Sequence, residues 1–357
     1  MSSQDPHIND PLPPGWSRGF SNSQKRTFYF HSETKHTQWH FPTASEAKDP
    51  MKALERANAN KEREKRKAAA ALAAPPEAKR PRSDDSVSDN LLEDLDTSSV
   101  AIIVPFRDLH AAQKRAAHLQ QFIPHMVQFL GNLKKDGKIS NYHIYIIEQS
   151  EDQRKFNRGK LLNIGFDVAR KAAARKHDVF VFHDVDLLPD ADLGDWYAKF
   201  PKRPIHIARV WKRYSNNPKY FGGAVSFSSS DYKRINGYPN NYWGWGGEDD
   251  EMQRRLERLG ITFEAPTRGS LKDLEDMTLT EKLDFLRSNK AWKNNVKWEL
   301  NDEHEKTWKT NGLADLKYSV LKTTELDGGN NHASKITVDV KLNGNHWTND
   351  KVSVDLI

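Results

Sequence analysis

The chain has 357 residues, a formal charge of +6 and no cysteine. That length exceeds what one hydrophobic core usually serves, so we expect about two domains and a linker. The absence of cysteine excludes a disulfide framework, a thiolate zinc site and a cysteine nucleophile. The N-terminus carries neither the basic nor the apolar region of a secretory signal, and no apolar run approaches the ~20 residues of a membrane helix. We therefore expect a protein of the nucleus or cytoplasm.

The positive charge lies in one segment of the chain. Residues 51–82 contain ten Lys and Arg against four Asp and Glu, so the remainder is neutral overall. A fold that is basic throughout, as many nucleic-acid-binding domains are, is therefore disfavoured. A basic tail or a targeting signal between neutral domains agrees with this distribution.

Residues 11–43 form the first predicted domain. Its strand-forming residues are interrupted by polar turns, which predicts a three-stranded antiparallel sheet. About 30 residues can bury only a small core, so the large aromatic side chains must supply it. The segment resembles a WW domain over its full length, with these features at the family's spacing: Leu12-Pro13-Pro14-Gly15-Trp16, Phe28-Tyr29-Phe30, Thr37-x-Trp39 and Pro42.

The resemblance implies a structural pair and a binding groove. Trp16 is expected to pack on Pro42. Trp39 and Phe28, with Tyr29 as the neighbour that could exchange roles with Phe28, are expected to form the groove that receives a polyproline II ligand.

Two features bear on the ligand of this groove. Ser32 stands where WW domains that read the PPxY motif carry His, which argues against that motif. The first loop, residues 21–26, offers Ser, Lys and Arg donors to a phosphate group. The expected partner is therefore a proline-rich or a phospho-Ser/Thr-Pro protein segment.

Residues 44–97 form the predicted linker. It is rich in Ala, Lys, Glu and Arg without an apolar stripe, so we expect it to be disordered. Lys65–Lys67 and Lys79–Arg82 have the spacing of a bipartite nuclear localisation signal. A charge run that only keeps the segment hydrated is the alternative interpretation.

Residues 98–342 form the second predicted domain, and residues 343–357 form a C-terminal tail. Apolar strands near residues 100–106, 142–149 and 179–186 alternate with helical segments, which predicts a parallel sheet covered on both faces. In such sheets ligands bind beyond the carboxyl ends of the strands, where Asp184 and Asp186 occur. Two carboxylates beside a buried strand need a cation or hydrogen-bond donors.

A second acidic cluster lies at residues 240–251. It combines Trp243, Trp245, three glycines and four successive acids at the start of a predicted helix. Helix N-termini favour carboxylates, so capping of this helix explains one such acid. Capping explains neither the tryptophans nor the glycines, and a binding site is therefore expected here.

From about Val100 to Leu342 the chain resembles the beta-1,4-galactosyltransferase family. The family's motifs occur in order: PFR (105–107), FNRGKLLNIGF (156–166), FxDVDLLP (182–189), YFGG (220–223), NGYPNNYWGWGGEDDE (236–251) and NGLADLKYSVL (311–321). The implied fold is α/β GT-A, in which a Rossmann-like nucleotide-binding half merges with an acceptor-binding half. The implied activity is metal-dependent, inverting transfer from UDP-galactose, since Tyr220 matches the position at which galactose-preferring members carry Tyr.

The resemblance also assigns roles to single residues. Asp249 would be the general base that takes the proton of the acceptor hydroxyl, and Trp245 would lie on a glycine-hinged lid. The acceptor would contact Trp245, Glu248, Asp249 and Asp250. The donor would contact Pro105, Phe106, Arg107, Phe156, Arg158, Asp184, Tyr220, Gly222, Trp245 and Gly247.

A Mn²⁺ ion, or another divalent cation, would neutralise the leaving diphosphate. The resemblance makes Asp186 a direct ligand and places Asp184 near the ribose or the metal. The family's metal-binding His has no counterpart, because no His occurs between His206 and His304. The resemblance makes Met277 a candidate for the third ligand, because it matches a metal-contacting Met position of the family. Asp276, Asp273 and Glu275 are the other candidates, because their carboxylate oxygens suit Mn²⁺.

Three functions remain open at this level. The first is a nuclear or cytosolic galactosyltransferase that its WW domain brings to proline-rich or phosphorylated proteins. The second is a scaffold that has kept the transferase fold without turnover, which the missing His favours and the intact acidic cluster opposes. The third is a transferase acting on a modified nucleotide in nucleic acid, with the basic linker binding the phosphate backbone electrostatically.

Overall fold

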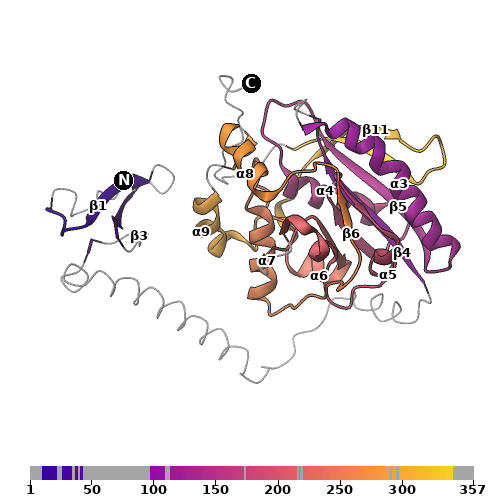
Figure 1. Ribbon diagram of the computed structural model, residues 1–357, viewed down its shortest axis with the longest axis horizontal. Coiled ribbons are helices and arrows are strands. Elements are labelled where there is room, and N and C mark those ends of the chain that lie inside the picture. The colour runs from indigo at the N-terminus through magenta and orange to yellow at the C-terminus, as the bar shows by residue number, and fades with distance from the viewer. Residues whose placement is uncertain are drawn as a thin grey trace. The chain divides into compact units, whose positions relative to one another are not determined.

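Figure 1 shows the protein as a computed structural model. The structure describes residues 10–21, 26–33, 37–38, 41–42, 97–108, 113–172, 174–214, 217, 220–289, 292–294 and 297–340. Linker residues 44–96, with both basic clusters, and the predicted tail 343–357 lie outside the described residues. The chain divides into two compact units, Met1–Val87 and Ser88–Ile357.

The first unit is a three-stranded antiparallel sheet, as predicted. Its strands are β1 (Trp16–Ser21), β2 (Arg26–His31) and β3 (Thr37–Gln38), in the order β1-β2-β3. Trp16 and Tyr29 form its buried core, against which Leu12 and Phe41 pack, and Pro42 is buried as well.

Tyr29 is a correction to the predicted groove. Its side chain is 1% exposed and packs edge-on against Phe41. Neighbouring residues of a strand point to opposite faces, so Tyr29 belongs to the core face and Phe28 to the other face. Phe28 is half-buried and packs over Gly19, where an added Cβ would lie 2.4 Å from the Phe28 Cζ atom. The third groove residue, Trp39, lies outside the described residues.

The second unit is built on a seven-stranded mixed sheet with the order β11-β12-β5-β4-β6-β9-β8. The four central strands β12, β5, β4 and β6 run parallel, while β11, β9 and β8 pair antiparallel. The three predicted strands, which are β4, β5 and β6, are therefore parallel as expected, and the antiparallel edge strands were not predicted. Short connections such as the one between β11 and β12 permit only antiparallel pairing. The strands are β4 (Ser98–Phe106), β5 (Ile139–Gln149), β6 (Val179–His183), β8 (Ile205–His206), β9 (Ala224–Ser228), β11 (Ser319–Glu325) and β12 (Ala333–Asp339).

Helices and a small second sheet complete this unit. The second sheet pairs β7 (Leu187–Pro189) antiparallel with β10 (Leu271–Asp273). None of the described helices is both long enough and apolar enough to cross a bilayer. They are α3 (Arg115–Lys135), α4 (Arg158–Lys171), α5 (Gly194–Ala198), α6 (Ser229–Arg234), α7 (Glu248–Arg258), α8 (Leu279–Ser288) and α9 (Lys297–Thr307).

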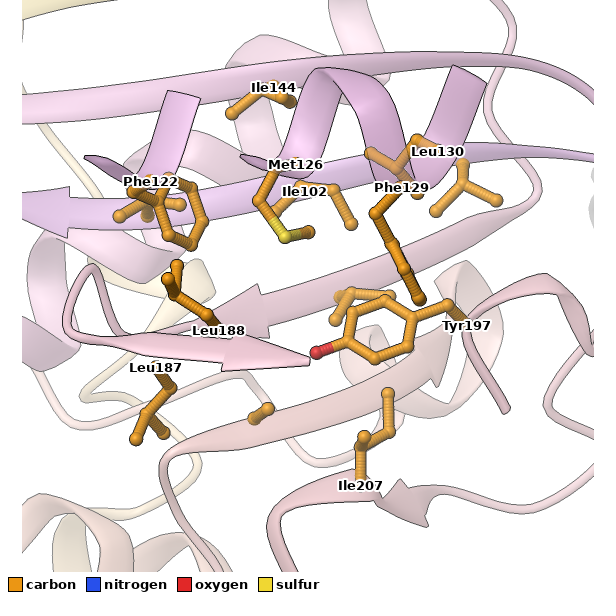
Figure 2. Close-up of a cluster of buried hydrophobic side chains, with 14 of the residues drawn as sticks. Ile102, Phe122, Met126, Phe129, Leu130, Ile144, Leu187, Leu188, Tyr197 and Ile207 are labelled. Carbon is orange, nitrogen blue, oxygen red and sulfur yellow. The ribbon is translucent and has the colours of Figure 1, made fainter. Parts of the chain in front are cut away.

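Apolar side chains bury both faces of the central sheet. Along β4, Ile102 and Val104 point to the core that α3 covers, while Ala101 and Ile103 point to the core that α4 covers. Figure 2 shows part of the first core, where side chains of α3 meet Leu187, Leu188 and Tyr197. Every residue of β4 is buried, which explains the unbroken apolar run at residues 100–106.

Helix α4 lies very close to the sheet at Gly165. An added Cβ there would lie 2.3 Å from the Ile103 Cγ2 atom and 2.9 Å from the Ile147 Cγ1 atom. Both contacts are with side chains in the packed core, which has no space to yield. Gly165 therefore sets the distance at which α4, and Arg158 at its first turn, stand from the strands.

We expect Gly165→Ala to lower the free energy of unfolding by about 1–3 kcal/mol, because overpacking forces neighbouring side chains off their rotamers. Urea denaturation measures this change. The matched control is Gly131→Ala in α3, where the added Cβ meets only the Tyr142 hydroxyl at 3.7 Å. This control should be neutral or stabilise by up to about 1 kcal/mol through helix propensity. Equal effects of the two substitutions would contradict the close-packing argument.

Candidate active site

A cleft of about 330 Å³ opens at the carboxyl ends of β4 and β6 and at the first turns of α4 and α7. Ligands of open α/β sheets bind at this edge. The cleft brings together predicted residues from distant parts of the sequence: Pro105, Phe106, Arg107, Phe156, Arg158, Asp184, Asp186, Tyr220, Trp245, Gly247, Glu248, Asp249 and Asp250.

Gly222 lies directly behind the cleft, against the predicted base. An added Cβ at Gly222 would come 2.3 Å from the Asp249 Oδ2 atom and 2.9 Å from the Tyr220 hydroxyl. Glycine is thus required here by close approach rather than by contact with a ligand. This position supports Asp249, which differs from the donor contact expected for Gly222.

Arg107 marks the end of β4 in the cleft. Its guanidinium donates to the Asp152 carboxylate at 3.0 Å and to the Arg154 backbone carbonyl at 2.8 Å. The Gln149 side chain ties the same loop together, because it donates to Asp152 and to the Lys155 carbonyl. The loop between β5 and α4 is therefore fixed around Arg107.

Arg158 joins three elements of the cleft. It begins α4, directly after Asn157, whose side chain caps the helix by accepting from the Lys160 backbone N–H. Its Nε donates to Asp184 at 2.7 Å and its Nη1 donates to Asp249 at 2.7 Å. The side chain of Arg158 is only 12% exposed. One buried guanidinium thus positions carboxylates from the end of β6 and from the start of α7.

The pKa of Asp249 is raised well above that of an ordinary aspartate. Burial is the main cause, Arg158 opposes it, and the nearby charges of Glu248, Asp184 and Asp250 raise the pKa further. A carboxylate whose pKa is raised binds a proton more readily, which is what a general base requires near neutral pH. Asp249 therefore has the electrostatic environment of a base.

The segment before α7 carries Trp245 at the mouth of the cleft. Its side chain is 37% exposed, while the neighbouring Trp243 is buried. Gly246 and Gly247 follow with φ angles of 105° and 106°, a conformation that L-residues with side chains rarely adopt. Trp245 is thus held between a buried anchor and two glycines, which suits a side chain that moves over a bound ligand.

Asp186 lies in a second cluster, which is an ion-pair network. Arg115 Nη1 donates to Asp186 at 2.6 Å and Arg115 Nη2 donates to Glu275 at 2.7 Å. Burial opposes ionisation of Asp186, but the charge and hydrogen bond of Arg115 outweigh it and hold the Asp186 pKa at about 2. Glu275 also accepts from Arg213 at 2.8 Å and pairs with Lys282.

The pairing of β7 with β10 builds this cluster. Asp273 lies opposite Leu187 in the register, and the Leu274 backbone N–H donates to the Asp186 carbonyl at 2.7 Å. Asp273 itself pairs with Arg213 at 2.6 Å. Of the predicted third ligands, Asp273 and Glu275 therefore lie near Asp186. Asp276 and Met277 line a smaller cavity beside His118, and the Met277 carbonyl accepts from Arg213.

The donor chemistry of this cluster suits Mn²⁺, because Asp186 and Glu275 offer carboxylate oxygens that converge on one cation. That cation is the Arg115 guanidinium. Within the described part of the chain, no three Asp, Glu or His side chains stand grouped to hold a metal ion. The residues fit a divalent cation by type, and the Arg115 guanidinium now stands between the two carboxylates.

Sequence reasoning missed the basic members of the cluster. Arg115 begins the helix after β4, and the first strand-to-helix connection of such folds commonly faces the ligand, so its position was a usable signal. Arg213 and Lys282 have no such signal, because they reach the cleft from a 3-10 turn and from α8. Trp211 and Tyr214 also line the cleft, and Tyr214 stacks on Tyr220 with ring centroids 4.1 Å apart.

Three family models match the chain. The model described as the N-terminal region of glycosyl transferase group 7 matches residues 94–198, and the N-terminal domain of galactosyltransferase matches residues 202–282. A WW domain model matches residues 12–42. The first two together span more than half of the 357 residues.

The chain belongs to the beta-1,4-galactosyltransferase family. Beta-1,4-galactosyltransferase 4 of Cricetulus griseus is 34% identical over 242 residues, which are 67% of this chain and 63% of that protein. Human beta-1,4-galactosyltransferase 4 is 34% identical over 62% of this chain and 59% of its own length. The chain thus matches less than two thirds of these relatives' length.

A solved structure of the family shares the fold. It is a mutant of Drosophila beta-1,4-galactosyltransferase 7 in complex with manganese, UDP-Gal and xylobiose. The likeness has a TM-score of 0.54 at 27% identity and covers 70% of this chain and 95% of the Drosophila chain. The expected GT-A fold beside a WW domain is thereby confirmed.

We expect Arg158→Met to lower the free energy of unfolding by about 3 kcal/mol at neutral pH, because it leaves two half-buried carboxylates without a cation. The loss should shrink as the pH falls through the raised pKa values of Asp184 and Asp249, since neutral carboxyls need no cation. Urea denaturation at several pH values measures both effects.

The control for this substitution is Arg170→Met in the last turn of the same helix. Arg170 is 42% exposed and pairs with Asp167, so its loss should cost less than about 1 kcal/mol. A cost for Arg158→Met that stays the same from neutral to acidic pH would contradict the assigned role.

Proposed function

We propose that the chain transfers galactose from UDP-galactose to an acceptor hydroxyl, with inversion at the anomeric carbon and in the presence of Mn²⁺. The observation that carries the proposal is the cleft itself, in which Asp249, with its raised pKa, stands near Asp184 and Asp186 at the end of β6. The complex of the Drosophila relative with manganese and UDP-Gal supports the donor and the ion.

The chemistry follows from single displacement. Asp249 accepts the proton of the acceptor hydroxyl while that oxygen forms a bond to the anomeric carbon. The bond between the anomeric carbon and the diphosphate oxygen breaks, and UDP leaves with the electron pair. Arg158 holds Asp249 in place until an acceptor approaches, and Trp245 excludes water when it covers the donor.

The charges of the cleft support a requirement for a metal. Seven basic and six acidic side chains line it among the described residues. Two further acids, Asp152 and Asp273, pair with Arg107 and Arg213. The cleft therefore has no surplus of positive charge for a diphosphate. When bound, Mn²⁺ would supply that charge and stabilise UDP as the leaving group, with Asp186 as a ligand of the ion.

The choice of galactose rests on Tyr220. Its ring stacks on Tyr214 and its hydroxyl lies beside Gly222, so the side chain is held in a fixed position in the cleft. Tyr220 also matches the position at which galactose-preferring members carry Tyr. Asp250, which pairs with Lys297, would hold the hydroxyls of the acceptor sugar.

The WW domain would bring this transferase to proline-rich or phospho-Ser/Thr-Pro segments of target proteins. A module tethered by a linker of roughly 50 residues can raise the local acceptor concentration towards the millimolar range. The two basic clusters of the linker would serve as a nuclear localisation signal.

We expect Asp249→Asn to reduce galactose transfer by about 10²–10⁴-fold, because the amide cannot take the acceptor proton. Binding of UDP with Mn²⁺, measured by calorimetry, should change little, since Asp249 acts on the acceptor side. An enzyme that keeps its transfer rate after this substitution would rule out Asp249 as the base. Absence of UDP binding in the unmodified protein would instead reject the transferase function itself.

The pH dependence of transfer gives a second test of the base. Asp249 must be ionised to accept a proton, so kcat/KM should fall on the acid side through its raised pKa. This limb should lie clearly above the value of about 3.9 of an ordinary aspartate. A rate that stays constant down to that value would contradict the assignment.

For the WW domain, we expect Phe28→Ala to weaken binding of a proline-rich peptide by about 1–3 kcal/mol, because an aromatic anchor of the groove is lost. Fluorescence anisotropy with one unphosphorylated and one phosphoserine-proline peptide measures this change. Phe20→Ala removes another exposed aromatic of the same sheet and serves as the control. Equal losses for both variants would argue against a groove at Phe28.

A further inference from the structure

The Asp186 cluster places an arginine where two carboxylates converge. Arg115 donates one nitrogen to Asp186 and another to Glu275, at 2.6 and 2.7 Å. These acids come from the end of β6 and from the segment after β10, and they are only 7% and 5% exposed. Two buried carboxylates that face one another repel unless a cation stands between them. Arg115 therefore performs the electrostatic task that a divalent ion would perform at the same oxygens.

Arg115 differs from the other two bases of the cluster in its position. All three line the cleft, but the Arg115 side chain is 18% exposed, whereas that of Arg213 is 4% exposed and that of Lys282 is 5% exposed. Arg213 and Lys282 continue to pair with Glu275 if Arg115 leaves. Asp186, in contrast, loses the guanidinium that pairs with it. Departure of Arg115 thus frees mainly one carboxylate, and this carboxylate is the expected metal ligand.

The start of α3 makes such a movement feasible. Arg115 is the first residue of the helix, and the preceding Lys114 has a left-handed φ of 51° without a side-chain cap. A long guanidinium side chain at a helix start can turn from one anionic partner to another without unfolding the helix. A diphosphate in the cleft offers pairs of anionic oxygens, which can accept from both nitrogens of Arg115 as Asp186 and Glu275 now do.

We propose that Arg115 is a resident counter-cation of the metal site, which it closes in the free protein and opens when the donor binds. Mn²⁺ then takes the oxygens of Asp186, and Arg115 turns to the diphosphate. This inference rests on the proposed function, because it presumes the same donor and the same ion.

The exchange makes metal and nucleotide binding interdependent. Mn²⁺ alone must displace two charge-assisted hydrogen bonds of Arg115, so it binds weakly. UDP alone meets a cleft whose arginines are already paired with acids. When both are present, each supplies the partner that the other displaces, so each tightens the binding of the other by the same factor.

The test measures Mn²⁺ binding to the full chain by electron paramagnetic resonance of the free ion, with and without UDP. In the unmodified protein, UDP should tighten Mn²⁺ binding by about tenfold or more. Arg115→Gln removes the competing charge, so Mn²⁺ alone should bind about tenfold or more tightly than to the unmodified protein. The additional tightening by UDP should become smaller, because the part that came from Arg115 is lost. Mn²⁺ affinity that is unchanged or weakened in Arg115→Gln overturns the proposal.

Two further variants sharpen the result. Arg107→Gln removes a cleft arginine that pairs with Asp152 instead of the metal-site acids, so Mn²⁺ alone should bind as in the unmodified protein. Arg115→Lys keeps the charge but not the two-pronged bridge, and should tighten Mn²⁺ binding by a smaller factor than Arg115→Gln. It also provides a folded comparison if the glutamine variant proves unstable. Tightening by Arg107→Gln equal to that by Arg115→Gln overturns the proposal.

The failure of this inference can be told from the failure of the proposed function. If UDP promotes Mn²⁺ binding but substitutions at residue 115 do not change it, the role of Arg115 is rejected. The metal-dependent transferase function is then still supported. Absence of Mn²⁺ binding in every variant, even with UDP, rejects both the role of Arg115 and the metal requirement. UDP binding in the presence of a chelator then shows whether a metal-free donor site remains.

Discussion

Burial of carboxylates in one cleft is the constraint on which this structure depends. An ionised acid removed from water costs free energy unless a cation or hydrogen-bond donors accompany it. Here Arg158 accompanies Asp184 and Asp249, and Arg115 accompanies Asp186. The arginines are not an addition to the acidic site, since they allow it to be folded before any ligand arrives.

The sheet supplies the geometry for this pairing. Parallel central strands bring the ends of β4 and β6 to one edge, and α4 and α7 begin at that edge with Arg158 and with the acids of residues 248–250. Close packing at Gly165 and at Gly222 then fixes the position of α4 and of the Asp249 carboxylate. The core and the site are therefore linked, because small residues in the packing determine where the charges stand.

Much of this arrangement could be predicted from the sequence. The apolar run in β4 indicated a buried strand, and every residue of β4 is buried. The acids after β6 indicated a site at the end of that strand, and Asp184 and Asp186 line a cleft there, although their role stays a prediction. The antiparallel edges were not predicted, because strand direction depends on how the connecting segments return. Tyr29 was misplaced, since periodicity separates the two faces of a strand without saying which face a small core uses. Arg213 and Lys282 were missed because an isolated basic residue in a loop or helix has no local pattern.

The sequence by itself determined the two-unit organisation, the family and the identities of the acids, since these depend on composition, apolar periodicity and the spacing of motifs along the chain. Only the tertiary structure decided which cation neutralises which acid. Asp186 and its partner Arg115 are separated by 71 positions, and Arg115 and Glu275 by 160. The physical reason is that electrostatic pairing acts through space over a few ångströms, so it is fixed by how β7, β10 and α3 pack rather than by any neighbour in the sequence.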